Sequence, residues 1–366
     1  MTSEQIPVVR LGTEGPEVGA QGLGCMGISF AYGPTDGTEA RAALERALEL
    51  GVTHFDTADM YGSGDNERFL AAFVRAHREQ IVLATKFGIA VDPHDPTRRT
   101  IHNDRAYIRR SIEASLKRLE ADHVDLYYMH RRDLTVPIEE TVGAMAELVV
   151  EGKVRHLGLS EVTGAELRAA HRVHPITAVQ SEWSLFSRDV EKTVVPAARE
   201  LGVAFVPYSP LSRSFLSGSF TNAHKDLTAG DLRGALPRFT GDNAAANAEL
   251  LEPLRAVAAE HSATPAQIAL AWVHQQARVH GLTVVPIPGT RKRTRVEENT
   301  RALRITLSEE ALSLLDRIAD QVAGVRYPDV RSISAGREED YAATTPRRVA
   351  AAPITPPSAP SSPPPG

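Results

Sequence analysis

The sequence predicts an α/β fold, an eight-stranded (β/α)8 barrel of the TIM type, from two observations. Apolar strand-like runs alternate with segments of helical periodicity, an order that favours a parallel sheet. Most of these runs also end on a polar or reactive side chain, and strand ends converge at one rim of a parallel barrel, where the active site lies. Eight units with polar ends favour a closed barrel over an open doubly wound sheet. The runs are Gly22–Met26, Val52–Asp56, Ile81–Lys86, Asp125–His130, Val154–Ser160, Ile176–Gln180, Val203–Tyr208 and Leu282–Ile287.

The segments between the runs predict amphipathic helices that pack around the sheet. Their apolar residues recur at intervals of three and four, the spacing of one helix face. Glycines follow several of these segments, and the next strand begins at once, as at Gly51, Gly152 and Gly202. The clearest apolar sets are Ala40, Ala43, Leu44, Ala47 and Leu48; Ile108, Ile112, Leu116 and Leu119; and Val142, Met145, Leu148 and Val149.

Three further segments lie outside the repeating units. Val8–Leu11 and Val18–Gln21 flank a turn-rich stretch and predict a β-hairpin that closes the barrel bottom. The Ser- and Gly-rich connection Leu211–Phe239 follows the seventh strand and is long enough to predict a functional lid. Ser308 is expected to cap an additional helix that runs to about Val322.

We expect one barrel domain over residues 1–345 and a disordered tail over 346–366. The tail is composed mainly of Pro, Ser and Ala, which cannot bury enough apolar surface to order itself.

Composition describes an ordinary globular protein. The chain has 366 residues and a formal net charge of -5, which gives no overall attraction to nucleic acid or to an anionic membrane. Cys25 is the single cysteine, so an internal disulfide is excluded and a cytoplasmic location is expected. No run is apolar enough for a membrane span, and His-x-His, a metal-ligand pattern of barrel hydrolases, is absent. We expect no metal, and a monomer or small homo-oligomer.

The glycines between Gly22 and Gly27 match the dinucleotide-binding pattern G-x-G-x-x-G letter for letter. That fingerprint requires a strand before it and a helix that opens at its third glycine. Here a loop follows, and the first helix is expected only at about Thr38. We therefore interpret the motif as a glycine-rich first barrel strand rather than a Rossmann fold.

Four strand-end segments carry a resemblance that covers about residues 8 to 328. They read GVTHFDTADMYG from Gly51, ATKFG from Ala84, DLYYMHR from Asp125 and GLSE from Gly158, and IPGT follows from Ile287. In order and spacing they resemble the aldo-keto reductase superfamily, and specifically its bacterial and plant branch with a Tyr-Tyr-x-His-Arg fourth strand.

The resemblance implies a catalytic tetrad of Asp56, Tyr61, Lys86 and His130. A phenol with a pKa near 10 is a poor acid and a poor base at neutral pH, so we expect the Lys86 ammonium to lower the pKa of Tyr61. Asp56 would hold Lys86 in place, and His130 would donate to the carbonyl oxygen of the substrate. Each residue alone has a structural explanation, but Lys86 and His130 interrupt buried apolar runs, which is costly without a partner.

The resemblance also implies a site for NADPH or NADP+. Ser160 and Gln180 would hold the nicotinamide carboxamide and Tyr208 would stack on its ring, although Glu161 stands where an asparagine is common and is expected to hold the loop instead. The basic run after the eighth strand opens a helix and suits the 2′-phosphate. The full set of expected cofactor residues is Gly27, Asp56, Ser160, Gln180, Tyr208, Ser209, Leu211, Arg213, Gly218, Gly289, Thr290, Arg291, Arg295, Glu298 and Asn299. Trp183 and Phe30 are candidate pocket walls, without an assigned role.

The implied function is reversible, NADPH-dependent reduction of an aldehyde or ketone to an alcohol, with Tyr61 as the general acid. Two alternatives stay open: a cofactor-sensing regulatory subunit with slow turnover, and a reductase-like barrel that has lost turnover. The sequence does not name the substrate, because specificity lies in the long loops and the C-terminal segment.

Overall fold

The structure is a computed structural model that describes all residues except 1–4, 93, 96–97, 221–226, 228–230 and 339–366. Its strands are β1 (Val8–Arg10), β2 (Glu17–Gly19), β3 (Leu23–Gly24), β4 (His54–Asp56), β5 (Val82–Phe87), β6 (Ile89–Val91), β7 (Arg99–Ile101), β8 (Val124–Met129), β9 (Val154–Ser160), β10 (Ile176–Glu182) and β11 (Ala204–Tyr208). Its α-helices are α1 (Gly37–Glu49), α2 (Asp65–His77), α3 (Arg105–Leu119), α4 (Ile138–Val150), α5 (Gly164–Val173), α6 (Val194–Leu201), α8 (Gly241–Glu249), α9 (Glu252–Glu260), α10 (Pro265–His280), α11 (Arg293–Arg301) and α12 (Glu309–Asp316).

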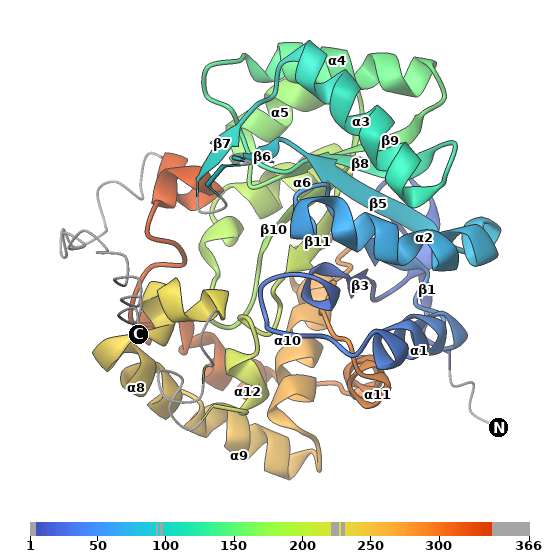
Figure 1. The fold of residues 1–366 in the computed structure, drawn as a ribbon. Coiled ribbons are helices and arrows are strands. Elements are labelled where there is room, and N and C mark those ends of the chain that lie inside the picture. Colours follow the sequence, from blue (N-terminus) through green and yellow to red (C-terminus); the bar gives the residue numbers. More distant parts are fainter. Residues whose placement is uncertain (1–4, 93, 96–97, 221–226, 228–230, 339–366) are drawn as a thin grey trace, which may run out of the picture.

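A parallel sheet forms the centre of the molecule, with helices packed around it (Figure 1). Its seven strands follow the order β11-β10-β9-β8-β5-β4-β3, and each pairs in parallel with its neighbour. The predicted eighth strand is not a regular strand, because Pro286 and Pro288 cannot donate to a ladder. It nevertheless bridges both sheet edges, through Val284 to Phe205 and through Gly289 to Gly24. The predicted barrel is confirmed as a nearly closed one.

The barrel interior is filled by a cluster of apolar side chains that point inward from the strands. Ala84, Tyr128, Ala178 and Val206 belong to this cluster, whereas the residues beside them face the helices. Because side chains alternate across a strand, the residue two positions beyond each of these also points inward, toward the rim. This alternation positions the candidate site.

The predicted N-terminal hairpin is confirmed. β1 pairs antiparallel with β2, and Leu11 and Val18 are buried against the interior cluster at the closed end of the barrel. Thr13 Oγ1 donates to the carbonyl of Gly202 at 3.0 Å, which fixes the hairpin to the base of the strands.

The interpretation of the glycine motif is also confirmed. β3 lies next to β4, a short 3₁₀ turn (Met26–Ile28) follows it, and α1 begins only at Gly37. A Cβ on Gly24 would lie 2.9 Å from the carbonyl oxygen of Ile287. The glycine is needed there because the first and last segments of the barrel meet backbone to backbone.

The expected helices occur, and their caps explain where they end. Gly51, Gly152 and Gly202 have φ angles of +87°, +76° and +66°, the left-handed conformation expected of a helix-ending glycine. The C-terminal helix is shorter than predicted: Ser308 caps α12, but the helix ends at Asp316 and a 3₁₀ turn follows at Ala319–Gln321. No helix of the described residues is long and apolar enough to cross a membrane.

Two segments extend the barrel beyond its repeating units, and the first of them was not predicted from the sequence. β6 and β7 form a hairpin directly after β5, with Ile89 opposite Ile101. The expected lid is partly described: Phe215 and Phe239 are buried in an aromatic cluster, and its function stays a prediction. The predicted disordered tail lies outside the described residues.

Candidate functional site

The rim of the barrel brings the predicted tetrad together. Asp56, Lys86 and His130 lie two positions beyond inward-facing residues of their strands, and all three are buried. Tyr61 follows β4 in a tight turn whose next residues, Gly62 and Ser63, have positive φ angles of 58° and 52°. That turn aims the phenol back over the strand ends, where its ring centroid is 5.8 Å from the ring centroid of His130, edge to face.

Lys86 is the centre of the buried part of the site. Its ammonium forms an ion pair with Asp56, donates to the carbonyl of Thr57 at 2.7 Å, and lies 5.3 Å from the ring centroid of Tyr61. The second carboxylate oxygen of Asp56 accepts a hydrogen bond from Gln180 Nε2 at 2.8 Å. Both charges are therefore compensated, which lessens the cost of keeping them out of water.

The electrostatics of the site favour a protonated phenol and a neutral imidazole. Burial and the nearby Asp56 carboxylate raise the pKa of Tyr61 well above its ordinary value. The net shift is upward because burial of the phenol outweighs the opposing charge of the Arg131 guanidinium. The lowering of this pKa that we expected from Lys86 stays a prediction. Burial, helped by Arg131 and Lys86, lowers the pKa of His130 well below its ordinary value. Its Nδ1 has no hydrogen-bond partner among the described residues.

The residues expected at the nicotinamide lie beside the tetrad. Ser160 ends β9 and is paired in register with Gln180, which lies two residues before the end of β10. Gln180 is hydrogen-bonded to Asp56, as described, so it also braces the tetrad. Tyr208 ends β11 and donates to the Glu161 carboxylate at 2.8 Å. Gly27 lies in the turn after β3.

The loop after β11 has the backbone of an anion site. Ser209, Ser212, Arg213 and Ser214 have φ angles of +46°, +46°, +54° and +75°. Left-handed residues of this kind turn successive N–H groups toward one side, and such concave loops bind phosphates. The buried Ser212 hydroxyl also has no partner among the described residues.

Arg213, Leu211 and Gly218 complete the expected pyrophosphate loop. The Arg213 guanidinium is 2.9 Å from Glu182 and donates to the Tyr327 hydroxyl at 2.7 Å. It is thus held by the protein itself. Leu211 is half-buried, and Gly218 has a positive φ of 70°.

The predicted 2′-phosphate region lies at the start of α11, and its cations differ in how they are used. Arg291 donates to the carbonyls of Tyr32 and Gly33, so it fixes the loop after β3. Arg295 is exposed and pairs with Glu298. The remaining predicted residues are Gly289, which closes the barrel against Gly24; Thr290, whose hydroxyl accepts from the Lys292 N–H at 3.2 Å; and Asn299, which is buried.

Glu161 connects the rim to the C-terminal segment, as we expected of a residue that holds a loop. Its carboxylate accepts from Arg326 at 3.0 Å, from the Ser334 N–H at 2.9 Å and from Tyr208. Burial alone would raise the pKa of Glu161, but the Arg326 and Arg131 guanidiniums lower it to about 2. No sequence signal pointed to Arg326, because this partner lies far along the chain.

Of the two candidate pocket walls, Phe30 lies at the site and Trp183 does not. Phe30 stacks on Tyr61 with ring centroids 6.1 Å apart. Trp183 is fully buried in the core between sheet and helices and donates to Glu191 at 2.9 Å, so the prediction that it lines the pocket is wrong. Trp183 directly follows Glu182, the last residue of β10 and the last one that pairs with β11.

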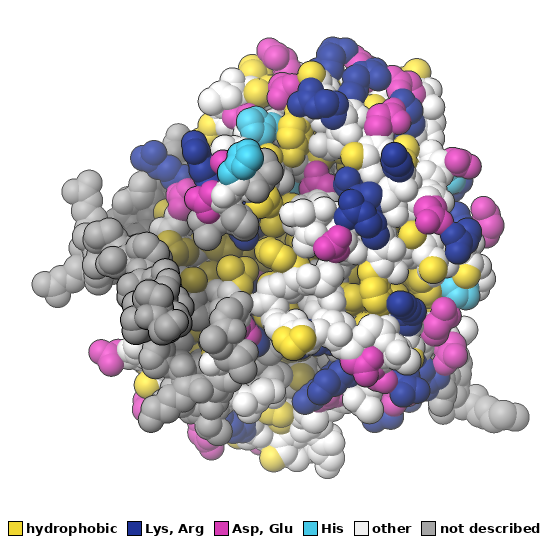
Figure 2. Space-filling view, viewed as in Figure 1, with side chains coloured by type: hydrophobic (Ala, Val, Ile, Leu, Met, Phe, Trp, Pro, Cys, Tyr) yellow, Lys and Arg dark blue, Asp and Glu magenta, His cyan; other side chains and the backbone are white. Residues whose placement is uncertain are grey.

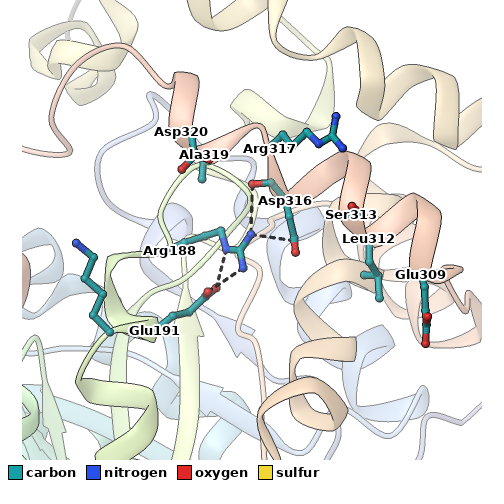
Figure 3. Close-up of a pocket in the computed structure, with 10 residues that line it drawn as sticks. Arg188, Glu191, Glu309, Leu312, Ser313, Asp316, Arg317, Ala319 and Asp320 are labelled. Carbon is teal, nitrogen blue, oxygen red and sulfur yellow. Dashed lines mark hydrogen bonds and ion pairs between the residues drawn. The ribbon is translucent and has the colours of Figure 1, made fainter.

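A cavity of about 750 Å³ lies elsewhere, between α12 and the loop after β10 (Figure 3). Arg188 spans it and pairs with Glu191 and Asp316, at 2.8 and 2.9 Å. None of the tetrad lines it, so this cavity is separate from the site at the barrel rim.

A parallel barrel with a buried Lys–Asp pair beneath a tyrosine and a histidine defines a class of oxidoreductase sites. Comparison with known proteins agrees: the family model described as "Aldo/keto reductase family" matches residues 21–320. The chain belongs to this family.

Individual relatives extend the match over most of the chain. A "Probable aldo-keto reductase 1" of Glycine max is 45% identical over 331 residues, which cover 89% of this chain and 93% of the relative. A thermostable aldo-keto reductase solved with the inhibitor epalrestat has a TM-score of 0.66 and 31% identity, covering 86% of this chain and 100% of that one. The glycerol dehydrogenase AKR11B4 of Gluconobacter oxydans has a TM-score of 0.74 and 26% identity, with 90% and 99% covered.

Proposed function

We propose that this protein reduces small aldehydes or ketones to alcohols with NADPH, with Tyr61 as the general acid. The observation that carries the proposal is the arrangement of Tyr61, His130 and Lys86: a protonated phenol and a neutral imidazole meet at the rim, with a buried ammonium 5.3 Å from the phenol ring centroid. We place the protein in the cytoplasm as part of this proposal, supported by its one cysteine, which is free and buried.

The reaction needs a proton at the carbonyl oxygen, and the site holds one there. The raised pKa of Tyr61 keeps its hydroxyl protonated at neutral pH, so it can donate as negative charge develops on the oxygen. His130 is neutral and offers a ring N–H to the same oxygen, which polarises the carbonyl. Lys86 stabilises the phenolate left behind until solvent returns the proton.

The residues present fit a nicotinamide dinucleotide. When bound, NADPH supplies the hydride. Ser160 and Tyr208 would hold its nicotinamide end, with Gln180 and Gly27 beside them, and Asp56 would act through Lys86. The left-handed backbone of Ser209 to Ser214 would take the pyrophosphate, supported by the unpartnered Ser212 hydroxyl.

The adenine end would lie at the start of α11. Thr290 and Arg295 are our candidates for the 2′-phosphate, and Glu298 and Asn299 for the adenine. A helix N-terminus and a guanidinium both favour phosphate. We assign Arg291 and Arg213 a supporting role, because both hold these loops through contacts within the protein.

The test is NADPH oxidation with a panel of aldehydes and ketones, for wild type and Tyr61→Phe, with fluorescence titration of NADPH. We expect turnover in wild type, a loss of about 10²–10⁴-fold in the variant, and unchanged NADPH binding. Binding without turnover in either protein would favour the cofactor-sensing alternative. Absence of binding would contradict the cofactor assignment.

A further inference from the structure

Apolar side chains form a cluster around Tyr61. Ala58 and Met60 are buried beside it, and half-buried side chains from two other segments pack on them. Figure 2 shows hydrophobic side chains gathered in the hollowed central part of the visible face, below the region of β6 and β7. The half-buried members are Met26 and Phe30 from the segment after β3, and Ile89 and Val91 from β6.

One cation stands at the edge of this cluster. Arg99 is exposed on β7, and its guanidinium carbon is 5.7 Å from the centroid of the Phe30 ring. Phe30 in turn stacks on Tyr61. The charge of Arg99 also contributes to lowering the pKa of His130, after burial, Arg131 and Lys86.

Arg99 has no carboxylate partner among the described residues, and its guanidinium is exposed, whereas the other arginines of this rim are held by carboxylates or by carbonyl and hydroxyl oxygens. The Arg131 guanidinium donates hydrogen bonds to the His130 carbonyl at 2.8 Å and to the Ser160 hydroxyl at 3.4 Å. In a chain of net charge -5, a guanidinium left unpaired beside an apolar cluster is a feature to explain. The paired arginines are Arg132 with Glu166, Arg213 with Glu182, and Arg233 with Asp231.

We propose that the substrate is an aldehyde or ketone that carries a carboxylate on an apolar or aromatic frame, with Arg99 binding the carboxylate. This rests on the proposed function, since it takes Tyr61 and His130 as the place of the carbonyl. The frame would lie along Phe30, Met60 and Ile89, and the planar guanidinium matches a carboxylate in a two-point contact. The stacked Phe30 ring separates the acid end from the reacting end.

The experiment compares two substrates that differ only in charge: para-carboxybenzaldehyde and its methyl ester. kcat/KM is measured with NADPH for wild type, Arg99→Gln and Arg99→Lys. Arg41→Gln is the matched control, because Arg41 is also exposed and lies 4.8 Å from a ring centroid, that of Phe69 on α2, away from the site. Calorimetry of para-(hydroxymethyl)benzoate with the NADP+-loaded proteins gives a readout that does not need turnover.

We expect wild type to prefer the acid, and Arg99→Gln to lose about tenfold in kcat/KM for the acid alone. Arg99→Lys keeps the positive charge but cannot make the two-point contact, so its kcat/KM for the acid should lie between those of wild type and Arg99→Gln. Arg41→Gln should have the kcat/KM of wild type. Equal use of acid and ester by wild type, or an equal loss of both in Arg99→Gln, would overturn the inference.

The two proposals can fail separately. Binding of the acid that weakens in Arg99→Gln, without turnover of either compound by any protein, would support the carboxylate site and refute the reductase. Turnover that ignores Arg99 would do the opposite.

Discussion

Two carboxylate–cation contacts of this barrel, Asp56 with Lys86 and Glu39 with Arg293, have the same chemistry but differ in exposure to solvent and in their hydrogen-bond partners. The side chains of the first pair are 3% and 0% exposed, and those of the second are 30% and 57% exposed. The buried pair is completed by Thr57 and Gln180, whereas water can replace either member of the exposed pair. The comparison teaches that a charge inside the barrel needs protein groups to compensate for the loss of water, whereas an exposed charge is solvated and does not.

The largest expected effect is on the buried pair. Asp56→Asn and Lys86→Met each leave one charge without its partner, and we expect each to reduce the free energy of unfolding by about 3–5 kcal/mol. Urea unfolding monitored by circular dichroism measures this. The double variant should lose much less than the sum of the two. Losses that simply add would show that the pair is not a coupled unit.

An intermediate effect is expected for Glu161, which is buried but shares its charge among several partners. Glu161→Gln should reduce the free energy of unfolding by about 2 kcal/mol at neutral pH, the range for hydrogen bonds to charged groups. Because the pKa of Glu161 is lowered to about 2 in the fold, its contribution should be complete above the unfolded pKa of about 4.3 and lost as the pH falls toward 2. Urea unfolding of both proteins from pH 3 to 7 tests this. A constant difference over that range would exclude the carboxylate charge as its source.

A smaller effect, on the cofactor rather than the fold, is expected at the start of α11. Arg295→Ala should raise the KM for NADPH about tenfold and leave the KM for NADH unchanged, because only NADPH carries the 2′-phosphate. Initial rates with each cofactor measure the difference. Arg293→Ala is the matched control, since its guanidinium is committed to Glu39. An equal rise for both cofactors would move the phosphate site elsewhere.

The smallest effect is expected for the exposed pair itself. Arg293→Ala should change the free energy of unfolding by less than about 1 kcal/mol, and high salt should remove most of that change. Urea unfolding at low and high ionic strength measures it. A loss comparable with that of Asp56→Asn would remove the contrast between the two regions.

The same contrast explains what could be predicted from the sequence. Lys86 and His130 interrupt apolar runs at strand ends, and strand alternation carries them to one rim, so their convergence was predictable. The tetrad as a set came from the family resemblance. The partner of Glu161 was not, because Arg326 lies 165 residues away on a segment without regular structure. The eighth strand was predicted by its apolar pattern, but its prolines break the ladder that the pattern implied. The raised pKa of Tyr61 could not be predicted, because it depends on how deeply the phenol is buried and no sequence motif shows this.

The seam where Gly24 meets Gly289 has a consequence for how the chain is made. The sheet is built in sequence order, yet among the described residues its first and seventh strands are joined through residues 282–289, after all seven strands. During synthesis both edges therefore stay open until nearly the whole barrel has emerged, and open edges are where chains pair wrongly with one another. Truncation before residue 282 should yield aggregates rather than a smaller barrel, even with the tetrad intact.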